Sequence, residues 1–328
     1  MKNTLGMLGV CLAIAACNNA PVAKTEPPKP EPTIASVLPS QTAGAPTVQA
    51  IDAAVVASAT GGKPETSDNV VKVSFPRQDV PVQVDGWTMP PFMGLTSWAA
   101  FTPGEKPGVE AMVMGDIVLF EDEVSSAMSA ALDGGLEVTA LHNHFFFDKP
   151  KVFFMHIGGE GKTETMGKAV RATLDAAAAV RKKFPEPQAR FATPVIPSPS
   201  RIDPTKVETA LGHKGTAKDG MVKVVIGRSA VVADCGCNVG KAMGVNTWAA
   251  FAGTDDDAVV DGDFAVLEEE LQPVLRALRA GGIHVVAIHH HMVGEKPRIL
   301  FVHYWGRGSV AELGKVLSKG LELTKSEK

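Results

Sequence analysis

Seven of the nine histidines in this chain lie in two short stretches that share one spacing, His-x-His followed by a third histidine twelve residues after the second. The six residues that keep this spacing are His142, His144 and His156, and then His289, His291 and His303. On a β-strand, residues two apart point to the same face and are separated by about 6.6 Å along the backbone. Imidazoles at that spacing can converge on one metal ion, with N–metal bonds of about 2.0–2.1 Å. The pattern therefore predicts transition-metal binding.

Three imidazoles with an open coordination position are typical of catalytic zinc, and imidazole also suits copper, nickel and iron. Zinc or copper is the expected ion. A fourth ligand, or an acid that orients the histidines, would come from the nearby carboxylates. The candidates are Asp116 and Asp263, or Glu121 and Glu268 at the starts of two expected helices.

The metal hypothesis depends on strand register. A hairpin centred on Lys149 would place His156 opposite His142 on the same face, and one centred on Lys296 would do the same for His303 and His289. A slip of one residue would move the third histidine to the other face.

Two alternatives need no metal. The histidines could be packed or hydrogen-bonded within a non-enzymatic binding or structural module of the cell envelope, or could act with an acid as the proton-transfer pair of a metal-independent hydrolase or lyase. The motifs G-x-S-x-G, H-E-x-x-H and Walker A are absent, so no catalytic or cofactor-binding residue is identified and enzymatic activity stays open. His284 and His290 have odd spacing relative to the paired histidines, which predicts the opposite strand face, at the surface or an interface.

The patterning predicts an α+β fold. Alternating or β-rich runs indicate strands over 70–75, 80–84, 98–101, 111–119, 136–146 and 151–157, the last two joined as a hairpin across Asp148-Lys149-Pro150. Helices are expected over 121–132, which has acids in its first turn and Gly134-Gly135 after it, and over the alanine-rich 163–180. Each unit then reads β-β-β-β-α-β-β-α, an antiparallel sheet with its two helices on one face.

The chain contains this unit twice. Residues 134–161 align without a gap on 281–308 with 12 identities in 28 positions, where unrelated segments would share about two. The sequence thus predicts a tandem duplication, packed as a pseudo-twofold pair. The first repeat domain is expected over 51–183, a Pro- and Ser-rich linker over 184–204, and the second repeat domain over 205–328.

The N-terminus has the features of a lipoprotein signal. Residues 1–16 form a short basic and apolar segment that ends in small residues before Cys17, the expected site of lipidation, for example with palmitate. Residues 17–50 continue as a Pro- and Ala-rich tether without hydrophobic periodicity. The expected location is the bacterial envelope, lipid-anchored at the outer membrane and facing the periplasm or the surface. A net charge of −4 with interspersed signs argues against a nucleic-acid partner, and no protein or cell-wall partner can be named.

Cys235 and Cys237 are the cysteines left after the signal peptide and Cys17. They are expected either as a local disulfide or as a thiolate pair for a soft metal ion.

Four motifs of the first repeat carry a family resemblance: T-S-W-A-A-F, M-G-D-I-V-L-F-E-D-E-V, L-E-V-T-A-L-H-N-H-F and F-F-M-H-I-G-G. Together they resemble the LppY/LpqO family, a domain of unknown function (DUF1259) common in bacterial lipoproteins and secreted proteins. The resemblance covers about residues 50 to 325, in both repeats, and implies an envelope location and a duplicated domain. It implies no catalytic residue.

Overall fold

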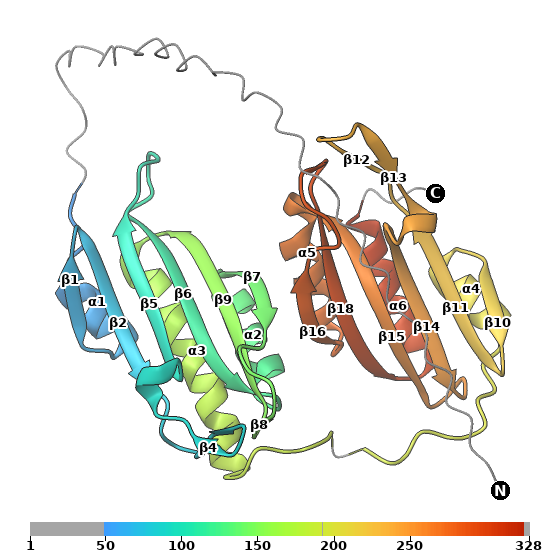
Figure 1. The fold of residues 1–328 in the computed structure, drawn as a ribbon, viewed down its shortest axis with the longest axis horizontal. Helices are drawn as coiled ribbons and strands as arrows, with labels where there is room; N and C mark the ends of the chain where they lie inside the picture. Colours follow the sequence, from blue (N-terminus) through green and yellow to red (C-terminus); the bar gives the residue numbers. More distant parts are fainter. Residues whose placement is uncertain (1–48, 192, 325–328) are drawn as a thin grey trace, which may run out of the picture. The chain divides into compact units, whose positions relative to one another are not determined.

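The computed structural model describes residues 49–191 and 193–324 (Figure 1). The expected signal peptide, Cys17 and most of the tether lie outside the described residues. Among those residues there are six α-helices and two 3-10 helices. They are α1 (Ala53–Thr60), η1 (Pro91–Met93), α2 (Val124–Asp133), α3 (Thr163–Lys183), α4 (Pro204–Leu211), η2 (Lys241–Met243), α5 (Glu268–Ala280) and α6 (Val310–Glu322). No described helix is both long and apolar enough to span a bilayer.

The strands follow the same order in each repeat. The first repeat contains β1 (Pro64–Ser67), β2 (Val70–Pro76), β3 (Gln83–Val84), β4 (Trp87–Thr88), β5 (Thr96–Pro103), β6 (Ala111–Phe120), β7 (Glu137–His142), β8 (Asp148–Lys149) and β9 (Val152–Gly161). The second contains β10 (Gly215–Lys218), β11 (Met221–Gly227), β12 (Ala230–Val232), β13 (Cys237–Val239), β14 (Asn246–Gly253), β15 (Ala258–Leu267), β16 (His284–His289), β17 (Glu295–Lys296) and β18 (Ile299–Gly308).

Twelve of these strands form one antiparallel sheet in the order β1-β2-β5-β6-β9-β7-β16-β18-β15-β14-β11-β10. The second half of this order repeats the first half in reverse, so an approximate twofold axis passes between β7 and β16. These two strands pair at Leu141 and Ile288. The predicted α+β fold and the tandem duplication are confirmed.

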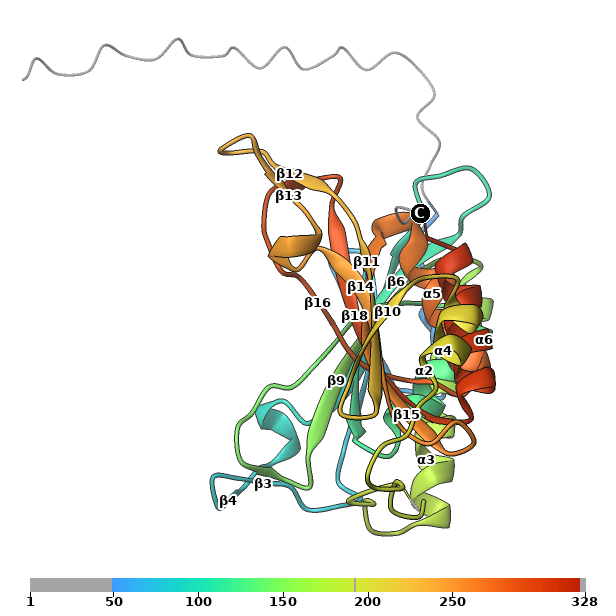
Figure 2. The ribbon, with the colours of Figure 1, turned by 90° about the vertical axis from the view of Figure 1, so that its right-hand side faces the viewer.

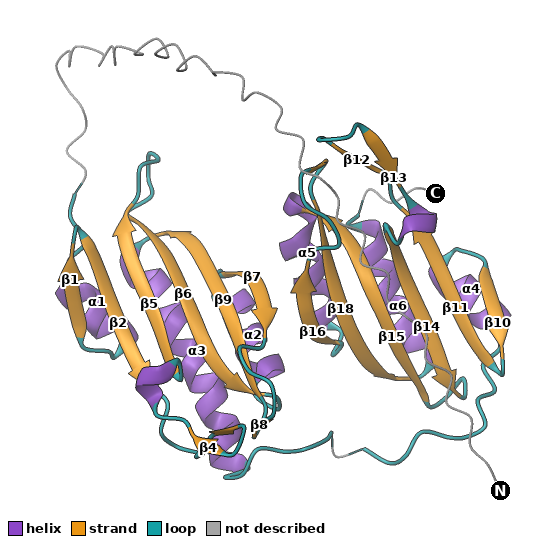
Figure 3. Ribbon diagram, in the orientation of Figure 1, coloured by secondary structure: helices purple, strands orange, loops and turns teal. Residues whose placement is uncertain are grey.

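The two faces of the sheet have different covers. The α-helices of each repeat lie against one face, while two three-stranded sheets, β4-β3-β8 and β13-β12-β17, stand on the other together with the short helices η1 and η2 (Figures 2 and 3). We call the face without α-helices the open face. The end of β6 is buried on both sides because α2 and α3 cover one face, and the loop that leads into β3, with Val80 and Val82, covers the other.

Each repeat begins with a helix and a strand that the patterning did not predict, α1 with β1 and α4 with β10. Both helices are eight residues long and have an N-cap aspartate and a C-cap glycine. Asp52 and Asp203 accept a hydrogen bond from a first-turn amide, and Gly61 and Gly212 end the helices with φ of 72°. The cap residues are visible in the sequence, but helices this short have little hydrophobic periodicity to reveal them.

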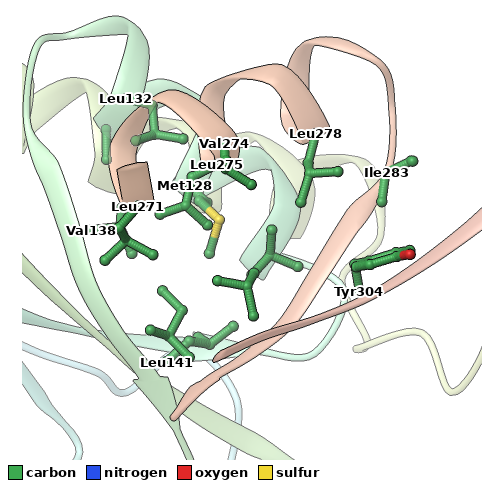
Figure 4. Close-up of a cluster of buried hydrophobic side chains, with 14 of the residues drawn as sticks. Met128, Leu132, Val138, Leu141, Leu271, Val274, Leu275, Leu278, Ile283 and Tyr304 are labelled. Atoms are coloured by element: carbon green, nitrogen blue, oxygen red, sulfur yellow. The ribbon is translucent and has the colours of Figure 1, made fainter. Parts of the chain in front are cut away.

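A shared hydrophobic core joins the repeats (Figure 4). Met128 and Leu132 of α2 face Leu271 and Leu275 of α5, and all four are at most 5% exposed. Full burial of one such side chain contributes about 1.5–3 kcal/mol.

Polar contacts cross the same junction. Gln272 of α5 accepts from the Val138 amide at 3.0 Å and donates to the Val138 carbonyl at 2.9 Å, and Arg276 donates to the Leu132 carbonyl. The two repeats are therefore one folded body.

The predicted hairpin is confirmed in its pairing, because β7 and β9 are antiparallel neighbours, but the connection across Asp148-Lys149-Pro150 is a longer loop than the pattern predicted. Strand β7 ends at His142 and β9 begins at Val152, and the connection between them carries β8, which pairs with β3 instead. The loop is closed by side chains, since Asn143 donates to the Val152 carbonyl and Asp148 accepts from the Val152 amide. Residues 80–84 are likewise mostly loop, and only Gln83–Val84 pair as a strand.

A buried ion network holds the start of α2. The Glu123 side chain is fully buried and accepts from Arg77 and Arg181 at 2.6 Å and from the Phe120 amide at 2.8 Å. Breaking such a network leaves buried charges without partners.

We expect Glu123→Ala to lower the free energy of unfolding by about 3–5 kcal/mol, because two arginines would lose their buried counter-charge. The matched control is Glu164→Ala, which removes an exposed ion pair with Lys168 and should leave stability almost unchanged. Urea denaturation of both variants measures this. Equal midpoints for the two variants would contradict the assigned role of Glu123.

Candidate metal centre

The second histidine set gathers around one carboxylate on the open face. Asp263, in the middle of β15, lies between Trp248 on one neighbouring strand and His303 on the other. His303 pairs with Ala287, so His289, two residues further along β16, lies on the same face. His291 follows just beyond the end of β16. Strand pairing thus brings four potential ligands from β15, β16, β18 and one loop to a single point.

The three imidazoles face the same oxygen. The Nε2 atoms of His289, His291 and His303 lie 3.8, 3.6 and 3.7 Å from Asp263 Oδ2. Asp263, His289 and His291 place one ligand atom each within 4.8 Å of one another. These separations exceed ordinary hydrogen bonds. Asp263 Oδ2 is therefore nearly equidistant from three imidazole nitrogens, and His303 lies outside the group in which every ligand atom is within 4.8 Å of the others.

Backbone carbonyls orient two of the rings. His303 Nδ1 lies 3.2 Å from the Gly262 carbonyl oxygen, and His291 Nδ1 lies 3.1 Å from that of Gly244. A carbonyl only accepts, so each Nδ1 carries the proton and donates. The Nε2 lone pairs of these rings are consequently directed at the gap before Asp263, as in metal sites whose ligating histidines are held by a second hydrogen bond.

Polar atoms at the centre lack protein partners. Asp263 Oδ1 and His289 Nε2 are buried and have no hydrogen-bond partner among the described residues. Burial raises the pKa of Asp263 to about 6, although His303 opposes the shift, and burial lowers the pKa values of His289 and His291. A buried carboxylate that faces three imidazole nitrogens is an arrangement that a divalent cation would complete.

The first repeat holds the equivalent residues with similar ring separations, but among the described residues no imidazole nitrogen lies within 4.0 Å of the Asp116 carboxylate. The ring of His142 lies 5.2 Å from that of His144 and 5.0 Å from that of His156, measured between centroids. Asp116 pairs with His156 across the strands, and its buried Oδ1 has no hydrogen-bond partner among the residues that the structure describes. Burial raises the pKa of Asp116 and lowers that of His144.

A phenylalanine supports one ring in each set. His291 stacks on Phe301 at 3.5 Å between centroids, and His144 stacks on Phe154 at 3.3 Å. Phe301 and Phe154 are buried beneath the small sheets, so the second histidine of each His-x-His pair has a rigid support. This contact keeps the loop histidines near the strands although they lie past the strand ends.

The expected register was off by two residues. His142 pairs with Phe154 rather than His156, and His289 pairs with Phe301, because the hairpins are centred on Asp148 and Glu295, one residue before the expected centres. A two-residue shift preserves the face. Each third histidine therefore remains beside its His-x-His pair.

The structure does not bring Glu121 and Glu268 together with the histidines. Each lies five residues after its aspartate, which along a strand is about 16 Å and an odd number of positions. Glu268 is 3.5 Å from Arg298. Glu121 lines a cavity elsewhere, described below.

The two sets are separate. Asp116 on β6 and Asp263 on β15 are five strand positions apart in the sheet, about 24 Å at the usual spacing of about 4.8 Å. A single ion cannot bind both carboxylates, so the molecule offers two candidate sites on one face.

The cysteine pair and the two histidines with odd spacing lie away from these centres. Cys235 and Cys237 form a disulfide, so in this state they offer no thiolate pair. His290 is exposed with Nε2 3.0 Å from Arg298, and His284 lies at the junction of the repeats. The sequence reasoning missed the carbonyls of Gly244 and Gly262, whose role arises only from loop and strand geometry.

Comparison with known proteins gives one family. A family model described as a Domain of Unknown Function (DUF1259) matches residues 54–176 and again 205–323. A search of curated proteins found no match. Among solved structures, a trimeric bacterial microcompartment shell protein, PduB, is 14% identical over 79% of this chain and 89% of its own, with a TM-score of 0.18, too low to support an argument.

We expect Asp263→Asn to stabilise the metal-free protein above pH 6. The pKa of Asp263 is about 6 in the folded protein, against an ordinary value of 3.8. Between these two pH values the folded state binds a proton that the unfolded state has released. The charged carboxylate therefore lowers the stability of the folded protein above pH 6, and this loss disappears as the pH falls toward 4. Thermal unfolding in chelator from pH 4 to 8, compared with the unsubstituted protein, measures this. Destabilisation by Asn at pH 8 would mean that the carboxylate serves the fold.

Proposed function

This chain belongs to the DUF1259 family, and we propose that within it the second repeat binds a divalent transition-metal ion, zinc foremost, through Asp263, His289, His291 and His303. The first repeat offers a second, weaker site through Asp116, His142, His144 and His156. The proposal concerns binding first. Storage, sensing and a metal-assisted reaction are all compatible with such a site.

One observation carries the proposal: Asp263 Oδ2 is nearly equidistant, at 3.6 to 3.8 Å, from three imidazole nitrogens. Four ligands about 2.0–2.1 Å from a tetrahedral zinc ion lie about 3.3–3.4 Å from one another. The three nitrogen–oxygen separations exceed that edge by a few tenths of an ångström. The ligand atoms of Asp263, His289 and His291 lie within 4.8 Å of one another, and the His303 ring would have to turn toward the other two imidazoles to complete the set.

The donor set also restricts the metal. Three imidazoles and a carboxylate suit zinc, copper, nickel or iron, and disfavour ions that prefer all-oxygen or thiolate sites. The histidine side chains are 30 to 39% exposed while Asp263 is 2% exposed, so the ion would enter from the imidazole side. A bound zinc ion there would act as a Lewis acid toward a ligand approaching from solvent.

The first site is proposed as weaker because its ring orientation is less constrained. In the second repeat two rings donate to backbone carbonyls, whereas in the described part of the first repeat the only such contact is a 3.4 Å approach of His142 Nδ1 to the Asn143 carbonyl. Fixing free rings on metal binding costs side-chain entropy.

The envelope location is also a proposal. It rests on the short apolar N-terminal segment, on Cys17 after small residues, and on the Pro- and Ala-rich stretch that follows. Labelling of expressing bacterial cells with radioactive palmitate tests it. We expect label on the protein and none on Cys17→Ser, and equal labelling of both would contradict lipidation at Cys17.

Zinc titration of chelator-treated protein should show one tight equivalent and one weaker equivalent. We expect His291→Ala to abolish the tight step, because it removes a ligand whose ring is already oriented, and His144→Ala to remove the weaker one. Loss of one of four ligands should lower affinity by at least about a hundredfold. Isothermal titration calorimetry with Zn²⁺, and the visible bands of bound Co²⁺, measure stoichiometry and geometry.

The matched control is His290→Ala, which removes an exposed imidazole between two of the proposed ligands. It should leave both steps unchanged. Absence of stoichiometric binding of zinc, cobalt and copper would overturn the proposal. Catalysis that persists in chelator but disappears in His291→Ala would instead support the metal-independent acid–base alternative.

A further inference from the structure

A cavity of about 450 Å³ lies at the junction of the two repeats, and no residue of either histidine set lines it. Its volume is within the range of natural small-molecule sites, about 300–1,000 Å³. We propose that it binds a small uncharged molecule with an apolar body and one hydroxyl or carbonyl group. This site is independent of the metal centres.

The cavity exists because the duplication is not exact here. Gln272 near the start of α5 closes its side of the junction with two hydrogen bonds to Val138 of β7. The residue at the equivalent place in α2 is Ser125, whose side chain is shorter by three heavy atoms. Only Leu141 and Ile288 pair between β7 and β16, so the strands separate beyond that point. On the Ser125 side this leaves space.

The polar end of the cavity is a serine–histidine pair drawn from both repeats. Ser125 Oγ lies 2.6 Å from Nδ1 of His284, the first residue of β16. Burial lowers the pKa of His284 to about 4, so its ring is neutral at physiological pH. The serine hydroxyl and the neutral imidazole each carry one proton, and one of these protons forms the hydrogen bond between them. The pair therefore has one donor and at least one acceptor left for a ligand. A hydroxyl group can use both, and a carbonyl group can use the donor.

The walls are apolar and come from the four strands β7, β9, β16 and β18. Leu141 and Val285 are at most 3% exposed, and Phe153 and Trp305 continue the lining. Phe191, from the segment between the repeats, stacks on the His284 ring at 4.2 Å between centroids and an interplanar angle of 22°. It covers the cavity from the solvent side, and its side chain remains 50% exposed.

The covering segment is anchored. The backbone N–H of Gln188 donates to Asp122 Oδ2 at 3.0 Å, and the same carboxylate accepts from the Arg181 side chain. The linker is therefore held over the cavity through a charge pair at the start of α2.

The charges near the cavity cancel. Asp122 is matched by Arg181, and the exposed Glu121 and Arg190 carry opposite signs. A neutral histidine and balanced charges provide no counter-ion for a carboxylate or an amine. Moving a charged ligand from water into this apolar space without a counter-charge is unfavourable, so we expect the ligand to be uncharged.

The test uses N-phenylnaphthylamine, an uncharged fluorophore whose emission rises in apolar surroundings, added to the purified protein. We expect saturable binding, and displacement by octanol at lower concentrations than by octanoate or octylamine. Ser125→Gln, which installs the residue of the second repeat, should weaken binding by at least about tenfold. Ser67→Gln, the same exchange at an exposed position of β1, should have no effect.

A second variant covers the case in which Ser125→Gln fails to fold. Val286 lines the cavity and is 44% exposed, so Val286→Trp can fill the entrance without disturbing the core. It should weaken probe binding to a similar degree. The proposal is overturned if the unsubstituted protein does not bind the probe, if a folded Ser125→Gln or Val286→Trp binds it unchanged, or if a charged competitor is the better one.

Discussion

A single buried carboxylate constrains much of this molecule. Asp263 lies in the middle of a sheet strand, 2% exposed, with one oxygen atom that has no partner among the described residues and another that faces three imidazoles at 3.6 to 3.8 Å. Burying a charge in this way is costly unless something compensates it. The strand register, the carbonyls that hold two of the rings and the small sheet beside them all act to keep the imidazoles around that oxygen. A divalent ion is the compensation that this arrangement fits.

The duplication explains how one sheet supports two such places and why they differ. The pairing of β7 with β16 joins the repeats edge to edge, so both sets of histidines stand on the open face while the helices form a common core behind it. Sequence change after duplication then acted on each half separately. Two rings of the second set have backbone partners. At the junction, Ser125 and Gln272 occupy equivalent positions, and the side of Ser125 is an open cavity while the side of Gln272 is closed.

Much of this could be predicted from the sequence, and the failures have physical causes. The spacing of the histidines and its repetition predicted which residues meet, because alternation along a strand is robust to an even shift of register. The choice among acids was harder, since Asp116 and Glu121 look equivalent in sequence and only the cross-strand pairing to His156 separates them. The short helices at the start of each repeat have caps but little periodicity. Contacts between the repeats, such as Ser125 with His284, depend on packing that no local pattern encodes.

The most direct test of the central account is a zinc-soaked crystal of the protein measured at the zinc absorption edge. The account predicts an anomalous peak about 2.0–2.2 Å from Asp263 Oδ2 and from the Nε2 atoms of His289, His291 and His303. A second, weaker peak is expected between Asp116 and the first histidine set. Zinc found elsewhere, with Asp263 hydrogen-bonded directly to a protonated histidine, would contradict it.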